Sequence, residues 1–320
     1  MNSSSNLEPR IQELLTRTSR TFALAIPLLP PPVRLEVSVA YLLFRVADTV
    51  EDGRLLTTAE KLEALDRLNA LLTEGDFSVV DRAAWLSKAP CDDQDCLDLL
   101  DDLPLVLAVT ETLDPQARAV ILKHVCASIV GMKQVLEACD DEANEVRLES
   151  LDDLRDYCYH VAGLVGEMLT ELFLLASPEL HSVRLEMEAQ ARWFGEGLQL
   201  VNILKDSEVD RSEGRHFIPA TVPRTRLLEL AREDLGKATV YVSALRQAKA
   251  PGGFLAFTNL PLQLAWRTLE CVEQLGPGSK VPRAEVVRIM NEVISQFVHA
   301  ENNASQAQLD KGRSREAATR

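Results

Sequence analysis

The chain has 320 residues, is 46% hydrophobic, and carries 49 acidic against 34 basic side chains, which gives a net charge of −15 at pH 7. This balance argues against nucleic acid as a partner, because a phosphate backbone favours a basic surface. Glycine is scarce, at 14 residues, and aromatic residues make up 5% of the chain. The composition therefore favours helices over a β-sandwich or a glycine-rich nucleotide-binding fold.

The beginning of the chain, MNSSSNLEPRIQELL, lacks the basic-then-apolar pattern of a signal peptide. No window approaches the ~20 uncharged apolar residues of a membrane span. The most apolar run starts at Val161 and is interrupted by Glu167 and Glu171. The six cysteines form no CxxC pair, so we expect reduced thiols. A soluble cytoplasmic protein is predicted.

The N-terminal third is predicted to begin with a disordered segment over residues 1–8 and a helix over 8–25, which the run PLLPPP must end. A second helix, over 33–48 or beyond, is apolar on most faces, and this is typical of a central helix. Residues 59–73 have the amphipathic pattern of a surface helix.

The rest of the chain is also predicted to be helical. The acidic segment from Cys91 begins as a loop, and the polar tail over 303–320 is expected to be disordered. No alternating pattern of a strand persists, so we expect one all-helical domain over residues 9–302. Its further helices are expected over 103–113, 116–139, 151–176, 181–206, 224–249, 253–275 and 282–302.

Two oxygen-rich stripes lie at the ends of apolar helices. Asp48 and Asp52 are four residues apart, which places both carboxylates on one helix face. The second stripe consists of Gln199, Asn202, Asp206 and Asp210. Each stripe alone is better explained by a solvated helix end. However, a helix C-terminus disfavours acidic groups. Two such placements suggest that the stripes face each other across a cavity and that cations, best Mg²⁺, bridge them to a diphosphate.

Basic and hydroxyl groups lie close to both stripes in the sequence. They are Ser19, Arg20, Arg45, Lys205 and Arg215. Arg45 has two open interpretations, an ion pair with one of the aspartates or a clamp on phosphate oxygens.

A third segment, DYCYHVAGLVGEM, places Gly163 and Gly166 inside a predicted helix. Glycine costs about 1 kcal/mol there relative to alanine, so another group is expected to approach closely. Either a neighbouring helix packs against these residues, or they leave room for a long apolar ligand. In the second case Tyr157 and Tyr159 would stand near a reaction centre.

The chain resembles squalene/phytoene synthases over roughly residues 10 to 300. The resemblance depends on four segments in register, TSRTFALAIPLLP, RVADTVEDG, YCYHVAGLVGE and GLQLVNILKDSEVDRSEGRHFIP. It implies an isoprenoid-synthase-type helical bundle around a central cavity, in which Mg²⁺ and two aspartate motifs act on prenyl diphosphates.

The resemblance also implies roles for individual residues. The metal ligands would be Asp48, Asp52, Asn202, Asp206 and Asp210, and the four aspartates and Tyr157 would be catalytic. Substrate would be bound by Ser19, Arg20, Phe22, Arg45, Gln199, Asn202, Lys205 and Arg215. One departure is Lys205, where the family usually has arginine; lysine keeps the charge but lacks the planar fork. Phe22, Val161, Ala162, Leu164 and Val165 are expected to line the cavity.

The C-terminal third resembles squalene synthases more than phytoene synthases. The implied reaction joins two farnesyl diphosphates through presqualene diphosphate to squalene, with NADPH as reductant. Lys280 and Arg283 would meet the dinucleotide, or they are two solvated cations. The alternatives are a phytoene or dehydrosqualene synthase, an enzyme that stops at presqualene diphosphate, a non-catalytic family member, and a helical adaptor. Peripheral membrane contact for product release is also left open, and the sequence does not indicate an oligomeric state.

Overall fold

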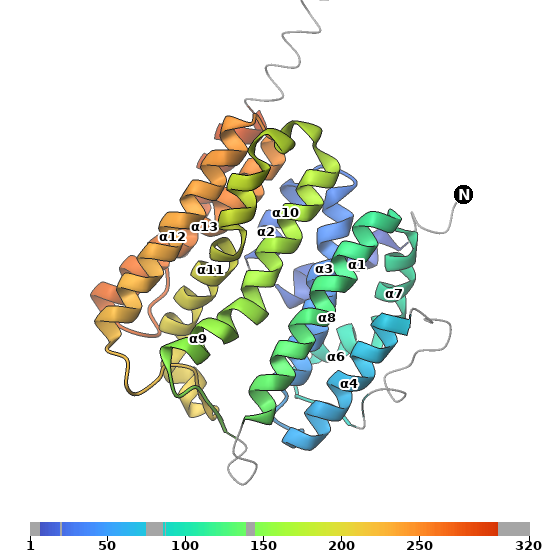
Figure 1. The fold of residues 1–320 in the computed structure, drawn as a ribbon, viewed down its shortest axis with the longest axis vertical. Coiled ribbons are helices and arrows are strands. Elements are labelled where there is room, and N and C mark those ends of the chain that lie inside the picture. The colour runs from blue at the N-terminus through green and yellow to red at the C-terminus, as the bar shows by residue number, and fades with distance from the viewer. Residues whose placement is uncertain (1–6, 20, 75–85, 87, 139–144, 300–320) are drawn as a thin grey trace, which may run out of the picture.

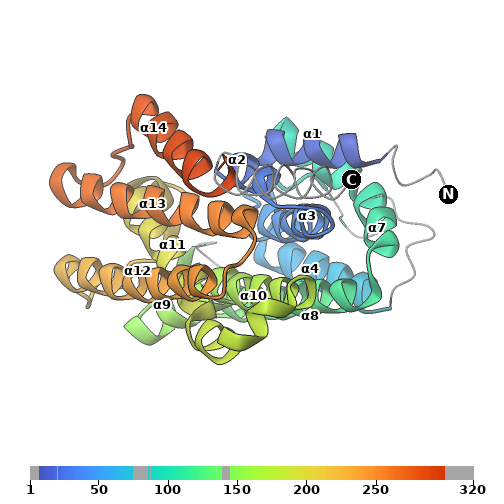
Figure 2. The same ribbon diagram turned by 90° about the horizontal axis from the view of Figure 1, so that it is seen from above.

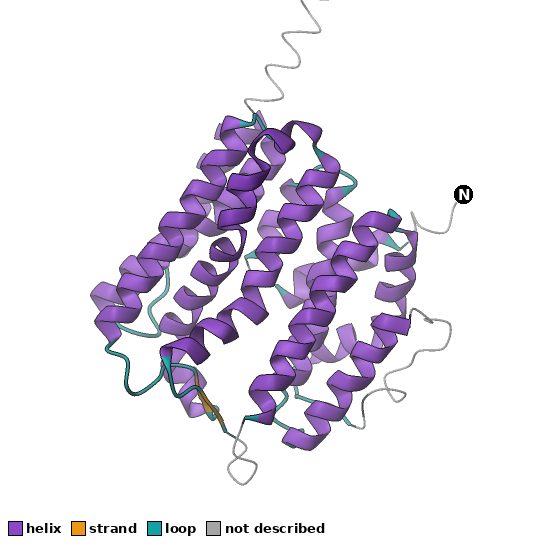
Figure 3. Cartoon of the chain, viewed as in Figure 1, coloured by secondary structure: helices purple, strands orange, loops and turns teal. Residues whose placement is uncertain are grey.

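The computed structural model describes residues 7–19, 21–74, 86, 88–138 and 145–299. Helices make up almost all of this part of the chain (Figure 3). The predicted all-α class is therefore confirmed. Residues 1–6 of the segment 1–8 and the tail 303–320, both predicted to be disordered, lie outside the described residues. The prediction is wrong for the end of the first segment, because Leu7 caps a helix that begins at Glu8.

The N-terminal half contains six α-helices and one turn of 3₁₀-helix among its described residues. These are α1 (Glu8–Thr18), α2 (Phe22–Ala25), the 3₁₀ turn η2 (Ile26–Leu28), α3 (Val33–Glu51), α4 (Thr58–Glu74), α6 (Gln94–Asp101) and α7 (Leu103–Thr112). The central part contains α8 (Pro115–Glu137), β1 (Val146–Arg147), α9 (Leu151–Cys158), the π-helical turn η3 (Tyr159–Gly163) and α10 (Leu164–Ala176). The C-terminal part contains the 3₁₀-helix η4 (Pro178–Val183), α11 (Arg184–Ser212), β2 (Arg215–His216), α12 (Arg224–Gln247), α13 (Gly252–Leu275), α14 (Arg283–Ile294) and the π-helical turn η5 (Ser295–His299).

The helices form two groups around a shared core (Figure 1). One group contains α1, α3, α4, α7 and α8, the other contains α11, α12 and α13, and α10 lies between them (Figure 2). Helix α3 contacts α1, α4, α6, α7 and α8, and 14 of its 19 residues are buried. Because it is apolar on most faces, α3 is the central helix that the sequence predicted.

The predicted helix over 8–25 is wrong as one element. Helix α1 ends at Thr18, and Ser19 adopts an extended conformation. The hydroxyl oxygen of Ser19 then accepts hydrogen bonds from the backbone N–H groups of Phe22 (3.1 Å) and Ala23 (3.2 Å) at the start of α2. A serine side chain that satisfies such exposed N–H groups favours a new helix start over continuation of the old helix.

The predicted helix over 151–176 is interrupted by the π-helical turn η3. Here the backbone meets α11 directly, since a Cβ atom on Gly195 would overlap the carbonyl oxygen of Ala162, and one on Gly166 would overlap that of Ala191. Close packing of helices thus explains Gly166. Gly166 also lies on the wall of an apolar cavity, so room for an apolar ligand stays a prediction beside the observed helix packing.

The prediction of no strand is wrong at one place. Strands β1 and β2 form a two-residue parallel pair in which Val146 lies opposite Arg215. The segment between Ser212 and Arg224 carries no periodic pattern, and its partner at Val146 lies 69 residues away from Arg215, so its own sequence does not reveal the pairing. This pairing fixes Arg215 just beyond the end of α11.

Two helical stretches, Pro115–Glu137 and Leu151–Ala176, are long and apolar enough to cross a membrane by length and composition. Their most apolar windows are 44% and 56% buried inside the protein, and α8 and α10 pack against each other. This burial is also typical of core helices in a soluble protein.

Candidate active site

An apolar cavity of about 190 Å³ lies where α2, α3, η3, α10, α11 and α13 meet. Its wall includes the expected Phe22, Val161, Ala162 and Val165. The polar side chains on this wall are those of Tyr41, Asp48, Gln199 and Asn202. The structure therefore brings Asp48 of the first motif and the beginning of the second oxygen-rich stripe to one cavity. Leu164 was predicted to line it, but this side chain is buried elsewhere in the fold.

Arg215 connects the two aspartate motifs. Its Nη1 atom lies 3.6 Å from Oδ1 of Asp52 on α3, and its Nη2 atom lies 2.9 Å from Oδ1 of Asp210 on α11. Glu213 makes a further ion pair with Nη2 at 2.5 Å. Burial alone would lower the pKa of Arg215, but these carboxylates outweigh burial and raise the pKa. Because one guanidinium reaches both motifs, the convergence that the sequence predicted is present in the fold.

The carboxyl groups at the C-terminal end of α3 are buried close to one another, which disfavours their ionised forms. Burial raises the pKa of Asp48 to about 7, with Asp52 adding to the rise and Arg45 opposing it. The pKa of Glu51 is also raised well above its ordinary value, by burial and by the same two aspartates. Burial raises the pKa of Asp210 too, against the effect of Arg215. A cation nearby would favour the ionised form of each carboxyl group.

The donor atoms fit magnesium. Asp48, Asp52, Asn202, Asp206 and Asp210 present only oxygen ligands, which Mg²⁺ prefers. Within the described part of the chain, no three His, Cys, Asp or Glu side chains converge closely enough to hold a metal by themselves. Mg²⁺ commonly takes one or two carboxylates and completes its shell with water and phosphate oxygens. The carboxylate pairs on α3 and α11 match that mode of binding.

A second cavity, of about 420 Å³, adjoins the apolar one and shares Phe22, Tyr41 and Asn202 with it. Ser19 and Arg45 also line this cavity. The Nε atom of Arg45 is buried without a hydrogen-bond partner among the described residues. A buried unpaired guanidinium N–H is costly, and an anion in the cavity would satisfy it. This observation favours the phosphate-clamp interpretation of Arg45. Arg20 lies outside the described residues.

Lys205 and Asp206 form an ion pair with each other, with 2.8 Å between Nζ and Oδ2. Both side chains are half-buried, about two turns before the end of α11. The lysine that departs from the family pattern thus neutralises one aspartate of the second motif. Any anion that Lys205 binds has to compete with that carboxylate.

The two tyrosines of the third segment lie in different places. Tyr157 is buried, its ring stacks on Phe217 with 4.6 Å between centroids, and burial together with the charges of Glu51, Asp52 and Asp48 raises its pKa. Tyr157 is therefore close to the first aspartate motif. Tyr159 instead packs on the outer side of the bundle, with Arg192 4.7 Å from its ring centroid. The expectation that Tyr159 stands near the reaction centre is wrong.

Lys280 and Arg283 are exposed and do not line either cavity. The loop that carries Lys280 lies beside α11 at Lys205, since the N–H of Gly278 donates to the carbonyl of Lys205 at 2.7 Å. The predicted dinucleotide site thus stays a prediction.

Sequence reasoning missed Tyr41. This side chain lines both cavities, and its hydroxyl donates to the carbonyl of Thr18 at 2.9 Å. The signal was present, because Tyr41, Arg45 and Asp48 follow one another at helical spacing of four and three residues.

The sequence matches the model of a known protein family. A family model described as Squalene/phytoene synthase matches residues 15–227, which covers both aspartate motifs. The chain belongs to the squalene/phytoene synthase family.

Two curated relatives of this chain are named squalene synthases. Squalene synthase ERG9 of Candida albicans is 28% identical over 296 residues, covering 89% of this chain and 61% of the relative. Squalene synthase of Eremothecium gossypii is 33% identical over 216 residues, covering 67% of this chain and 46% of the relative. The chain thus spans about half to three fifths of the length of these squalene/phytoene synthase family members.

A solved structure described as TcSQS in complex with the ligand E5700 has the same fold. It superposes with a TM-score of 0.74 at 22% sequence identity, covering 90% of this chain and 86% of that chain. The chain therefore shares the helical fold of that structure over most of its own length.

Proposed function

We propose that the chain is a magnesium-dependent prenyltransferase that joins two farnesyl diphosphates head to head. The product would be squalene, formed through presqualene diphosphate and reduced by NADPH. The observation that carries this proposal is the convergence of two aspartate motifs, bridged by Arg215, beside an apolar cavity that Asp48 and Asn202 also line. The squalene synthases among its relatives support this choice of product.

The side chains divide the chemistry between them. Asp48, Asp52, Asn202, Asp206 and Asp210 would hold Mg²⁺, which supplies Lewis-acid stabilisation of the negative charge on a leaving diphosphate. Arg45 and Arg215 bind and orient diphosphate oxygens through charge-assisted hydrogen bonds. The apolar wall, including Phe22 and Val165, excludes water from the allylic cation that ionisation leaves on the prenyl chain.

The product assay tests this proposal. Purified protein with farnesyl diphosphate, Mg²⁺ and NADPH is expected to yield squalene, and to yield presqualene diphosphate when NADPH is omitted. A C40 hydrocarbon from geranylgeranyl diphosphate would favour a phytoene synthase instead. Presqualene diphosphate alone in the presence of NADPH would indicate an enzyme that stops at the intermediate. If no prenyl product forms with any substrate, the enzymatic proposal is wrong and the adaptor remains.

A second expected result concerns Tyr157. Tyr157→Phe keeps the ring that stacks on Phe217 but removes the hydroxyl. We propose that this hydroxyl accepts the proton lost when the cyclopropane closes and passes its own proton to the departed diphosphate. The variant should fold normally and lose about 10²-fold in the rate of presqualene diphosphate formation. Single-turnover product analysis measures this step. Tyr159→Phe is the matched control, and equal losses in both variants would contradict the assignment.

A cytoplasmic location with peripheral membrane contact is also part of the proposal. The motivation is the product, a hydrocarbon that water does not dissolve. Cell fractionation tests it. Recovery of the protein with the membrane fraction would support peripheral contact, and recovery without membranes would contradict it.

A further inference from the structure

Two carboxylates with no exposed surface lie outside the proposed catalytic machinery, Glu196 on α11 and Asp234 on α12. Arg155 on α9 pairs with both. Its Nη1 atom contacts Oδ2 of Asp234 and lies 3.3 Å from Oε2 of Glu196, and its Nη2 atom donates to Oδ1 of Asp234 at 3.2 Å. One guanidinium thus connects three helices that are distant in the sequence.

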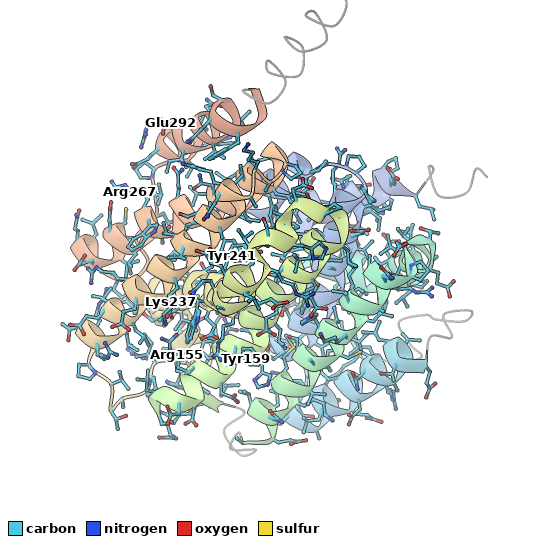
Figure 4. The ribbon with its side chains drawn as sticks, turned by 45° about the horizontal axis from the view of Figure 1, so that its top comes forward. Arg155, Tyr159, Lys237, Tyr241, Arg267 and Glu292 are labelled. Atoms are coloured by element: carbon cyan, nitrogen blue, oxygen red, sulfur yellow. The ribbon has the colours of Figure 1, made fainter. Side chains whose placement is uncertain are left out.

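Three cations surround these carboxylates. Arg192 donates from Nε to Oε1 of Glu196 at 2.6 Å, and Nζ of Lys237 lies 3.6 Å from Oδ1 of Asp234. The ring of Trp193 lies against all three cations, at 3.5 Å from Nζ of Lys237 and 5.3 Å from the guanidinium of Arg155. Figure 4 shows Arg155, Lys237 and Tyr159 on this side of the bundle. We call Arg155, Arg192, Glu196, Asp234 and Lys237 the ion cluster.

The ion cluster lies directly behind the cavity. A Cβ atom on Gly163, the last residue of the π-helical turn, would lie 3.2 Å from Oε1 of Glu196. Next to Glu196, Gly195 meets the carbonyl of Ala162, and both of these residues line the cavity. Arg155 also precedes Tyr157 by two residues on the same helix. The cluster is thus placed where α9, η3 and α11 jointly set the wall of the cavity and the position of Tyr157.

Net stabilisation does not explain such a cluster. Desolvation offsets most of the attraction in a buried ion pair, and apolar side chains of similar volume are often as stabilising. A planar guanidinium fork, however, fixes the direction of its partners, which apolar packing does not.

We propose that the Arg155–Glu196–Asp234 core of the ion cluster holds α9 and the π-helical turn in the geometry that the reaction needs, so that these are positioning residues for Tyr157 and the cavity wall. This inference rests on the proposed function. It assigns to the cluster the alignment of the reacting groups, and not the overall stability of the fold.

Two variants separate alignment from stability. Arg155→Lys keeps the charge and removes the fork, and the triple variant Arg155→Met/Glu196→Leu/Asp234→Leu replaces the ions with apolar volume. Arg226→Lys is the matched control, since Arg226 makes an ion pair with Glu233 at 3.0 Å on the surface of α12. Melting temperature, kcat, KM and the fraction of product released as presqualene diphosphate are measured for each.

We expect both cluster variants to fold, to lose about tenfold or more in kcat with little change in KM, and to release more of the intermediate, because a small misplacement of reacting groups is costly. Arg226→Lys should match the wild type. Wild-type kcat and product ratio in a folded Arg155→Lys variant would overturn the inference, whether or not the triple variant folds.

Amide hydrogen exchange tests the positioning role of the ion cluster without assuming the proposed function. In Arg155→Lys, backbone amides of 155–166 should exchange faster than in the wild type at an unchanged melting temperature. Unchanged exchange in that segment would also overturn the inference. Absence of any prenyl product from the wild-type protein would instead contradict the proposed function and leave the exchange result as the test of positioning.

Discussion

Asp48→Asn is expected to lower kcat by about 10²- to 10³-fold, the loss typical when one group that stabilises transition-state charge is removed. The amide keeps the size of the side chain and removes its negative charge, so a bridging Mg²⁺ loses an anionic ligand. Steady-state rates over a range of Mg²⁺ concentrations measure the effect. The variant should also need more Mg²⁺ for half-maximal activity.

Loss of folding can be separated from this loss of activity. Burial raises the pKa of Asp48 to about 7, so in the metal-free protein its ionisation opposes folding as the pH rises from the ordinary carboxyl pKa through 7. Uncharged asparagine removes that penalty. At pH 8 with a chelator present, the melting temperature of Asp48→Asn should equal or exceed that of the wild type.

The matched control for this variant is Asp66→Asn. Asp66 is an exposed residue on α4 that pairs with Lys133 at the surface, where ion pairs contribute about 0–1 kcal/mol. Its turnover and Mg²⁺ dependence should be those of the wild type. If Asp48→Asn also kept both wild-type values, Asp48 would not belong to a metal site.

Gly195→Ala is expected to lower the free energy of unfolding by about 3 kcal/mol, at the upper end of the cost of overpacking. The new Cβ atom would overlap the carbonyl oxygen of Ala162, which is backbone and has no rotamer to change. The π-helical turn η3 and helix α11 would therefore have to separate along the cavity wall. Urea unfolding followed by circular dichroism measures the change.

Gly236→Ala on α12 controls for helix propensity. Nothing lies within 4 Å of a Cβ atom at Gly236, so alanine should stabilise the helix by up to about 1 kcal/mol. The same substitution thus has opposite expected signs at two helical glycines. Equal effects of the two changes would show that close approach at Gly195 is not what requires glycine there.

The class of the fold could be predicted from the sequence because helical periodicity is a local property. The central position of α3 followed from its apolar residues on most faces, which leave no stripe for solvent. Spacing also placed Asp48 and Asp52 on one face of a helix, and Gln199, Asn202, Asp206 and Asp210 on another. The resemblance of four segments in register then indicated the family that the comparisons confirmed.

Helix interruptions were not predictable in this way. The residues after Thr18 continue an apolar stripe, and only the hydrogen bonds of the Ser19 hydroxyl show that a second helix begins there. The π-helical turn at Tyr159 occurs where glycines on two helices allow backbone contact. Tyr157 and Tyr159 are two residues apart in the sequence, yet one contacts Phe217 and the other Arg192.

By itself, the sequence determined which side chains share a helix face, because that depends on a repeat of 3.6 residues within one segment. Only the tertiary structure decided which faces meet. The contact of Arg215 with Asp52 and Asp210 requires the pairing of β1 with β2, and the ion cluster requires three helices to converge on Arg155. The contacts of Arg215 with Asp52 and of Arg155 with Glu196 and Asp234 join residues far apart in the sequence, so they depend on how the whole bundle packs and not on any local pattern.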